Sequence, residues 1–314
     1  MKLVVSGFAL GALLALLAGC SGSEDPLPPI LEVWNFGDPE GTLHAFERLD
    51  STAVSKGEDV YRAEVITQVA RCQGLLGKFD EAHATLDQVG ELAAADHPRV
   101  KTRVALERGR ILNSSGHPGE ALPVFVEAWE AAIEAGEDYL AGDAAHMVAI
   151  VAPLEEAEEW TERGRAFALD SEDTSVRHWL GPLHNNLGWS YYEAERYGDA
   201  IAQFRLSREA YEAEEDEVSA LIARYSTAKA LRSRGDAAQA VQILEEVDAA
   251  FRARDEIDGY VLDELAEGYL TLGKKAKSRR AAEEAVEILS KDTWFVQNQA
   301  ERLERLKELA AGTE

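Results

Sequence analysis

The chain has 314 residues, of which 46% are hydrophobic, 24 are glycine and 9 are proline, a composition typical of an ordered protein. Its 58 acidic residues outnumber its 32 basic residues and give a formal net charge of −26. Nucleic acids and anionic lipid headgroups bind basic surfaces, so this charge argues against nucleic acid as a partner and against a polybasic membrane contact.

The first twenty residues, MKLVVSGFALGALLALLAGC, have the pattern of a secretory signal, with Lys2 followed by an apolar stretch. The stretch is too short, and a polar segment follows it too closely, for a membrane-spanning helix. Its last four residues, LAGC, resemble the lipobox of bacterial lipoproteins. The resemblance implies that residues 1–19 are a signal peptide and that Cys20 is lipidated with a diacylglycerol and an N-terminal acyl chain. An ordinary cleavable signal with a chance cysteine is the alternative.

Residues 20–37 are expected to be the lipidated cysteine and a flexible tether, because SGSEDPLPP at 21–29 is polar and rich in proline. Ser21, rather than aspartate, follows the cysteine. By resemblance to proteobacterial lipoprotein sorting, this implies the outer membrane of the bacterial cell envelope, facing the periplasm. The second cysteine, Cys72, falls on the packed side of its expected helix and is interpreted as a small buried hydrophobic residue.

Residues 38–57 are expected to form an N-terminal capping helix ahead of an internal repeat. Glycine-containing turns followed by alanine recur, as in GKFDEA at 77–82 and GDAAQA at 235–240. The small residues that close these turns are spaced 39, 36, 43, 40 and 38 residues apart, and another small residue stands twelve residues before each. The closing residues are Ala82, Ala121, Ala157, Ala200, Ala240 and Ser278, and the earlier ones are Ala70, Gly109, Ala145, Gly188, Ala228 and Ala266.

Two antiparallel helices approach closely only where their side chains are small, so the pattern predicts helix pairs that stack into a solenoid. Larger apolar residues stand four places after the small residue that closes the turn: Leu86, Phe125, Phe204 and Leu244. The fourth repeat, with Leu187, Gly188, Tyr191, Tyr197, Ala200 and Phe204, resembles the tetratricopeptide repeat (TPR). The resemblance implies an all-α, TPR-type α-solenoid of about six helix-turn-helix repeats over residues 58–290, with a C-terminal capping helix in 291–314.

In TPR proteins one face of the first helix of each repeat, helix A, lines a concave groove. Numbering each repeat so that the closing small residue is place twenty puts the second, fifth, ninth and twelfth places on that face. The expected groove residues, with Asn186 beside them, are Arg71, Arg103, Arg110, Asn113, Tyr139, His146, Asn185, Asn186, Trp189, Tyr192, Tyr225, Lys229 and Arg232. Five consecutive ninth places hold three cations, a histidine and a tryptophan. This predicts a protein or extended-peptide partner bearing acidic residues.

The same residues have a second explanation, in which their charges are paired within the chain and a partner binds elsewhere. Acids such as Glu107 and Asp143 lie close enough in the repeat to neutralise the cations. The two interpretations differ in whether the cations are available to a partner.

Sequence patterns of catalysis are not found: the chain has no phosphate-binding glycine loop, nucleophile elbow or zinc-protease helix. We therefore expect no catalytic residues, no cofactor and no metal, and interpret the chain as a lipid-anchored scaffold or adaptor of the bacterial envelope. One alternative is a periplasmic regulatory protein that senses a peptide or a small ligand. A remote alternative is an enzyme that uses groove carboxylates and His146.

Overall fold

The computed structural model describes residues 26–312, and the regular structure in this range is helical. The expected signal peptide and Cys20 lie outside the described residues. None of the helices between residues 26 and 312 combines the length and the apolar character needed to cross a membrane.

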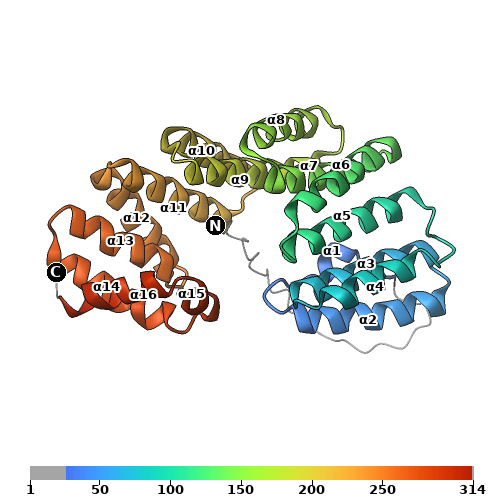
Figure 1. The fold of residues 1–314 in the computed structure, drawn as a ribbon, viewed down its shortest axis with the longest axis horizontal. Coiled ribbons are helices and arrows are strands. Elements are labelled where there is room, and N and C mark those ends of the chain that lie inside the picture. The colour runs from blue at the N-terminus through green and yellow to red at the C-terminus, as the bar shows by residue number, and fades with distance from the viewer. Residues whose placement is uncertain (1–25, 313–314) are drawn as a thin grey trace. The chain divides into compact units, whose positions relative to one another are not determined.

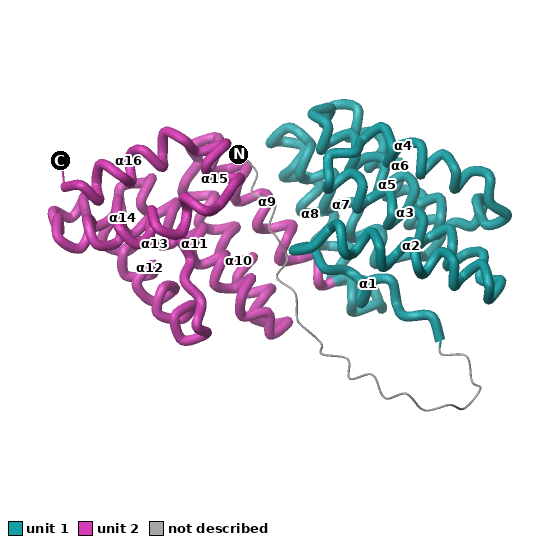
Figure 2. The backbone as a smooth tube through the Cα atoms, turned by 90° about the horizontal axis from the view of Figure 1, so that it is seen from below, with its two compact units in different colours: residues 1–176 teal, residues 177–314 magenta. Residues whose placement is uncertain are grey.

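The chain divides into two compact units, residues 1–176 and 177–314, which Figure 2 colours separately. Each unit is built from consecutive antiparallel helices (Figure 1). The described helices of the first unit are α1 (Ile30–Val33), α2 (Pro39–Lys56), α3 (Asp59–Leu75), α4 (Phe79–Val89), α5 (Pro98–Ser114), α6 (Pro118–Ala135), α7 (Asp138–Val151) and α8 (Leu154–Asp170).

A 3₁₀ turn, η1 (Thr174–Trp179), spans the boundary between the units. The described helices of the second unit are α9 (Leu180–Glu193), α10 (Tyr197–Ala213), α11 (Glu217–Arg234), α12 (Ala237–Arg252), α13 (Gly259–Thr271), α14 (Lys275–Leu289), α15 (Thr293–Asn298) and α16 (Ala300–Ala311). The last of them, α16, packs on α14 and α13 at the end of the chain.

Six helix pairs, from α3–α4 to α13–α14, carry the repeats within residues 26–312, with helix A the odd-numbered and helix B the even-numbered member. The predicted all-α array of helix-turn-helix repeats with a terminal capping helix is confirmed. The division of the array near residue 176 was not expected from the sequence.

The small residues of the repeat lie where helix A meets helix B. A Cβ atom on Gly109 would lie 2.5 Å from Cε1 of Phe125, and one on Gly188 would lie 2.6 Å from Cδ1 of Phe204. Both phenylalanines are fully buried. The glycines therefore leave the space that each aromatic ring fills, as the helix-packing interpretation requires.

The last repeat shows what a serine can add at the closing position. Ser278 is 2% exposed, and its hydroxyl donates a hydrogen bond to the backbone carbonyl of Ala266, with an O–O distance of 2.8 Å. This bond ties the two small positions of the repeat together directly. A hydroxyl is tolerated there because its proton has an acceptor.

The chain before α2 is ordered earlier than we expected. Ile30 is 7% exposed, and the indole N–H of Trp34 donates to Oε1 of Gln68 at 3.0 Å. The Tyr61 hydroxyl donates to the carbonyl of Pro28 at 2.8 Å. Packing of apolar side chains against α2 and α3 thus begins at residue 30, within the range expected to be a tether.

Candidate interaction surface

In the first unit, Arg110 of α5 contacts two acids, one on its own helix and one on the next helix A. Its Nη1 donates to Oε1 of Glu107 at 2.6 Å, and its Nη2 donates to Oδ1 of Asp143, on α7, at 2.5 Å. Arg71 of α3 approaches the same Glu107 oxygen at 3.8 Å. All of these side chains are less than a quarter exposed, so the contacts form a nearly buried ion-pair chain across α3, α5 and α7.

Burial and pairing act against each other in this chain. Burial lowers the pKa of Arg110, but Asp143 and Glu107 outweigh it and raise that pKa above its ordinary value. Burial raises the pKa of Asp143, but Arg110 and Arg71 hold it below its ordinary value. The ionised forms therefore stabilise one another, and removing one partner would leave a buried charge without compensation.

Arg103 and Arg71 make further contacts on the A-helix side of the first unit. Nε of Arg103 donates to Oε2 of Glu64 at 2.6 Å, and Arg103 is 7% exposed. The guanidinium of Arg71 lies 5.0 Å from the ring centroid of Trp34 and 5.3 Å from that of Phe36. The segment that precedes α2 thus covers one of the expected groove cations.

The second unit has a comparable cluster around Glu264 of α13, whose side chain is 0% exposed. Glu264 accepts hydrogen bonds from Nζ of Lys229 at 2.5 Å, Nε of Arg232 at 2.6 Å and Nη2 of Arg302 at 2.7 Å. Lys229 and Arg232 come from α11 and Arg302 from α16, so one carboxylate joins three helices. Burial raises the pKa of Glu264, but the three cations outweigh it and hold that pKa far below its ordinary value.

The pKa of Asp263, the neighbour of Glu264 in sequence, is shifted in the opposite direction. Burial raises its pKa to about 6, although its ion pair with Arg302 opposes the shift. Burial also raises the pKa of Tyr225 well above its ordinary value, and the ring of Tyr225 lies 6.0 Å from Nζ of Lys229. Tyr225 and Lys229 are 7% and 8% exposed, so neither presents much surface to a partner.

The ion pairs follow a rule within the repeat. A cation at the ninth place pairs with an acid at the sixth place of the next helix A. This holds for Arg71 with Glu107, Arg110 with Asp143, and Lys229 with Glu264. The ninth-place cations were recognised from the sequence, whereas the acids at the sixth places, Glu107, Asp143 and Glu264, were not recognised as recurring.

The aromatic residues of the fourth repeat are part of the packing between α9 and α10. Trp189 is 5% exposed, and its ring lies edge-on to Phe204 at 5.2 Å and to Tyr192 at 5.3 Å between centroids. The Tyr192 hydroxyl shares a hydrogen bond with the Ser233 hydroxyl at 2.8 Å. We expected Trp189 to face a partner, whereas its ring is enclosed by its own unit.

The expected groove residues thus fall into two classes by exposure. The buried ones are Arg103, Asn185, Trp189, Tyr225 and Lys229, and the half-buried ones are Arg71, Arg110, Asn113, Tyr139, His146, Asn186, Tyr192 and Arg232. The structure brings Arg71, Arg103 and Arg110 together in the first unit and Trp189, Tyr192, Lys229 and Arg232 in the second. Arg103, Arg110, Lys229 and Arg232 are paired with acids of the chain. The expectation of a basic column open to a partner was therefore wrong, because a buried cation requires a nearby acid.

The histidines that could be considered for a metal have other contacts. Nδ1 of His178 lies 3.2 Å from Oε2 of Glu214, and Nδ1 of His184 lies 2.8 Å from Oε1 of Gln203. In the range 26–312, no group of three or more histidine, cysteine, aspartate or glutamate side chains is arranged to hold a metal ion.

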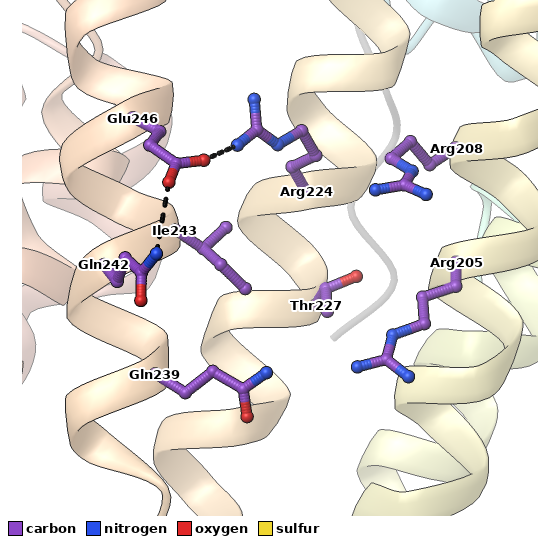
Figure 3. A pocket seen from close by; sticks show the side chains of 8 residues that line it. All are labelled: Arg205, Arg208, Arg224, Thr227, Gln239, Gln242, Ile243 and Glu246. Atoms are coloured by element: carbon purple, nitrogen blue, oxygen red, sulfur yellow. Dashed lines mark hydrogen bonds and ion pairs between the residues drawn. The ribbon is translucent and has the colours of Figure 1, made fainter.

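A pocket of about 250 Å³ lies between α10, α11 and α12 (Figure 3), on the helix-B side of the second unit. Arg205 and Arg208 of α10 and Arg224 of α11 contribute guanidinium groups, and α12 contributes Gln239, Gln242 and Glu246. This pocket was not predicted from the sequence, because the pair of arginines at places twenty-five and twenty-eight does not recur in the other helix pairs.

No protein-family model matches the chain, and no curated protein matches its sequence. Among solved structures, it is similar to a Podosopora anserina protein with nearly identical TPR-like repeats, named as a kinesin light chain. The identity is 18% over 63% of this chain and 98% of that chain, with a TM-score of 0.50. A second match is a Pyrococcus horikoshii signal transduction ATPase with numerous domains that has a TPR sensor. Here the identity is 13% and the TM-score 0.61, over 88% of this chain.

The chain has a tetratricopeptide-repeat fold. Its helices cover 45% of the length of the archaeal ATPase, so the likeness is confined to part of that protein. At these identities the likeness concerns the TPR fold alone. The resemblance seen in the fourth repeat is thus confirmed at the level of architecture.

Proposed function

We propose that this chain is a lipid-anchored TPR scaffold of the bacterial cell envelope that holds a protein partner or an extended peptide near the outer membrane. The observation that carries the proposal is the TPR fold preceded, in one chain, by a leader that ends in LAGC at residues 17–20. The packed structure begins at Ile30, ten residues after Cys20. Ten residues span at most about 35 Å, so the lipid would keep the first repeat close to the membrane surface.

The A-helix side is proposed to contact the partner through its half-buried residues. The cations there are already paired with acids of the chain, so recognition would depend on hydrogen bonds and aromatic contacts more than on net positive charge. Asn113, Asn186 and Tyr192 are suitable, because amide and hydroxyl groups can bind the polar backbone of an extended segment. The ion-pair chain of the first unit and the Glu264 cluster of the second would hold the A helices of each unit in register.

We also propose that the chain is not an enzyme. The most polar buried clusters of the described chain consist of acids paired with arginine or lysine, a pattern that stabilises the contacts between helices. A scaffold needs a defined surface, and these ion pairs would fix the spacing of the helices that form it. An enzyme would instead need turnover that is lost when one or two of these side chains are replaced.

The test compares wild type, Cys20→Ala and the matched control Cys72→Ala in the native host. Cell fractionation and crosslinking with mass spectrometry would be applied to all three. We expect wild type and Cys72→Ala in the membrane fraction, crosslinked to the same protein mainly through residues of the A helices. Cys20→Ala should leave the membrane fraction. Retention of Cys20→Ala in the membrane would contradict the anchor, and absence of any specific crosslinked protein would contradict the scaffold.

A further inference from the structure

The pocket between α10, α11 and α12 concentrates positive charge on a strongly acidic protein. Three arginines and one glutamate line it, which gives the lining a formal charge of +2, whereas the whole chain carries −26. Such a local reversal of charge attracts an anionic group and disfavours the rest of the protein surface as its binding site.

The three arginines differ in how far they are already paired. Arg224 forms a close ion pair with Glu246 of α12. Arg208 forms a looser ion pair, with Nε 3.5 Å from Oε1 of Glu212; its side chain is 37% exposed and its guanidinium donates no hydrogen bond to residues 26–312. Arg205 is exposed and forms no ion pair with residues 26–312. Arg205 and Arg208 therefore retain donors that a ligand could satisfy.

Arg205 and Arg208 share one face of α10, because residues three apart on a helix are neighbours. Figure 3 shows their guanidinium groups on one wall of the pocket and the amides of Gln239 and Gln242 on the opposite wall. Guanidinium groups bind carboxylates and phosphates through two parallel hydrogen bonds. The wall formed by Arg205 and Arg208 thus provides the chemistry for one oxyanion.

The opposite wall distinguishes a peptide from a free anion. A glutamine amide both donates and accepts hydrogen bonds, as the peptide backbone does, whereas a free phosphate offers mainly acceptors. Nε2 of Gln242 donates to Oε1 of Glu246 at 3.5 Å. The side-chain oxygens of Gln239 and Gln242 can accept hydrogen bonds from backbone N–H groups of a peptide. The nearby Glu246 carboxylate also disfavours a doubly charged group.

We propose that this pocket binds the carboxylate of an aspartate or glutamate side chain in a protein partner, with Arg205 and Arg208 holding the carboxylate and Gln239 and Gln242 holding the adjacent backbone. The proposal rests on the proposed scaffold function and assigns the acidic group of the partner to the helix-B side. There Arg205 forms no ion pair with residues 26–312 and Arg208 only a loose one, whereas Arg103, Arg110 and Lys229 on the A-helix side form close ion pairs with acids of the chain.

The first experiment follows the arginine Nε–H NMR signals of the full chain in detergent during titration with a blocked Gly-Gly-Glu-Gly-Gly peptide. The matched probes are the same peptide with glutamine, glutarate and inorganic phosphate. We expect the Arg205 and Arg208 signals to shift with the glutamate peptide and much less with the other three probes. Binding should weaken by about tenfold or more, or about 1.4 kcal/mol, in Arg205→Gln/Arg208→Gln, because the two substitutions remove the charge-assisted hydrogen bonds to the carboxylate.

The control variant is Arg279→Gln/Arg280→Gln, which removes two exposed arginines from α14 and makes the same change in net charge. It should bind the glutamate peptide as wild type does. Equal shifts with phosphate or glutarate would overturn the peptide assignment in favour of a general anion site. No shift of the Arg205 and Arg208 signals with any probe would overturn the site itself.

Partner capture separates this proposal from the scaffold function. If the crosslinked partner is found with wild type and is equally abundant with Arg205→Gln/Arg208→Gln, the scaffold stands and the pocket proposal fails. If the peptide binds at the pocket but no partner is captured in the native membrane, the pocket stands and the scaffold proposal fails. Loss of the partner in the variant, with retention in the α14 control, would support both.

Discussion

Glu264 illustrates how a single side chain can determine the local structure of a repeat protein. Its carboxylate is fully buried and accepts hydrogen bonds from Lys229, Arg232 and Arg302, which come from two other helices. The acid was visible in the sequence but was not linked to its cations, because the partners are separated by 32 to 38 residues. Aligning the sixth and ninth places of successive repeats would have predicted three ion pairs: Arg71 with Glu107, Arg110 with Asp143, and Lys229 with Glu264.

Replacement of Glu264 with glutamine should lower the free energy of unfolding by about 3–5 kcal/mol, because three cations would lose their buried counter-charge. Urea denaturation followed by circular dichroism measures this. The control is Glu283→Gln, which removes an exposed partner of Arg279 and should change the free energy by about 0–1 kcal/mol.

The pH dependence identifies the charge as the cause. The pKa of Glu264 in the folded chain lies below its ordinary value of 4.5, so its stabilisation is complete above pH 4.5 and is lost as the pH falls through the folded value. The gap between wild type and Glu264→Gln should therefore narrow as the pH is lowered below 4.5. A gap that is small at neutral pH, or that widens in acid, would contradict the role assigned to this carboxylate.

At the scale of helices, the contact between helix A and helix B is determined by small residues that the sequence makes conspicuous. Small residues recur at two fixed places in every repeat, and this periodicity was sufficient to predict the helix pairs. The aromatic group of the fourth repeat was less predictable, since Trp189 contacts Phe204 of its own pair. The arginine wall of the pocket was not predicted for a different reason, because its residues do not recur. Places twenty-five and twenty-eight hold Arg205 and Arg208 in one repeat, but Glu245 and Asp248 in the next.

Replacement of Gly109 with alanine tests the close approach. Alanine favours a helix over glycine by about 1 kcal/mol, but its methyl group would meet the Phe125 ring, from which an added Cβ is only 2.5 Å away. Overpacking of this kind costs about 1–3 kcal/mol, so we expect a net loss of stability in thermal denaturation. Gly119→Ala is the matched control, because nothing lies within 4 Å of a Cβ at that position. A variant Gly109→Ala at least as stable as Gly119→Ala would contradict the packing argument.

At the scale of the whole molecule, the excess of acid is the dominant electrostatic feature. The chain has 58 acidic and 32 basic residues, and the buried clusters already engage several of the bases with acids from neighbouring helices. The remaining acids lie on the surfaces of the helices and repel one another. The same excess makes the arginine-lined pocket distinctive, since a positive lining was not evident from composition.

Repulsion between these acids predicts that added salt stabilises the protein. The Debye length falls from about 30 Å at 0.01 M to about 8 Å at 0.15 M ionic strength, which screens exposed charges while leaving buried pairs largely unaffected. Exposed ion pairs weaken as well, but each contributes only about 0–1 kcal/mol, so relief of the −26 charge should prevail. We expect the midpoint of thermal unfolding to rise by a few degrees between these salt concentrations, at about 2–4 °C per kcal/mol.

The matched variant is Glu130→Gln/Glu134→Gln, which removes two exposed acids one turn apart on α6 and changes the formal charge from −26 to −24. Its midpoint in low salt should exceed that of wild type, and its further rise with salt should be smaller, because part of the repulsion is already gone. Sodium and potassium chloride should act alike if screening is the cause. A midpoint that falls with salt would mean that the ion pairs, and not the unpaired acids, dominate the electrostatic free energy of the folded chain.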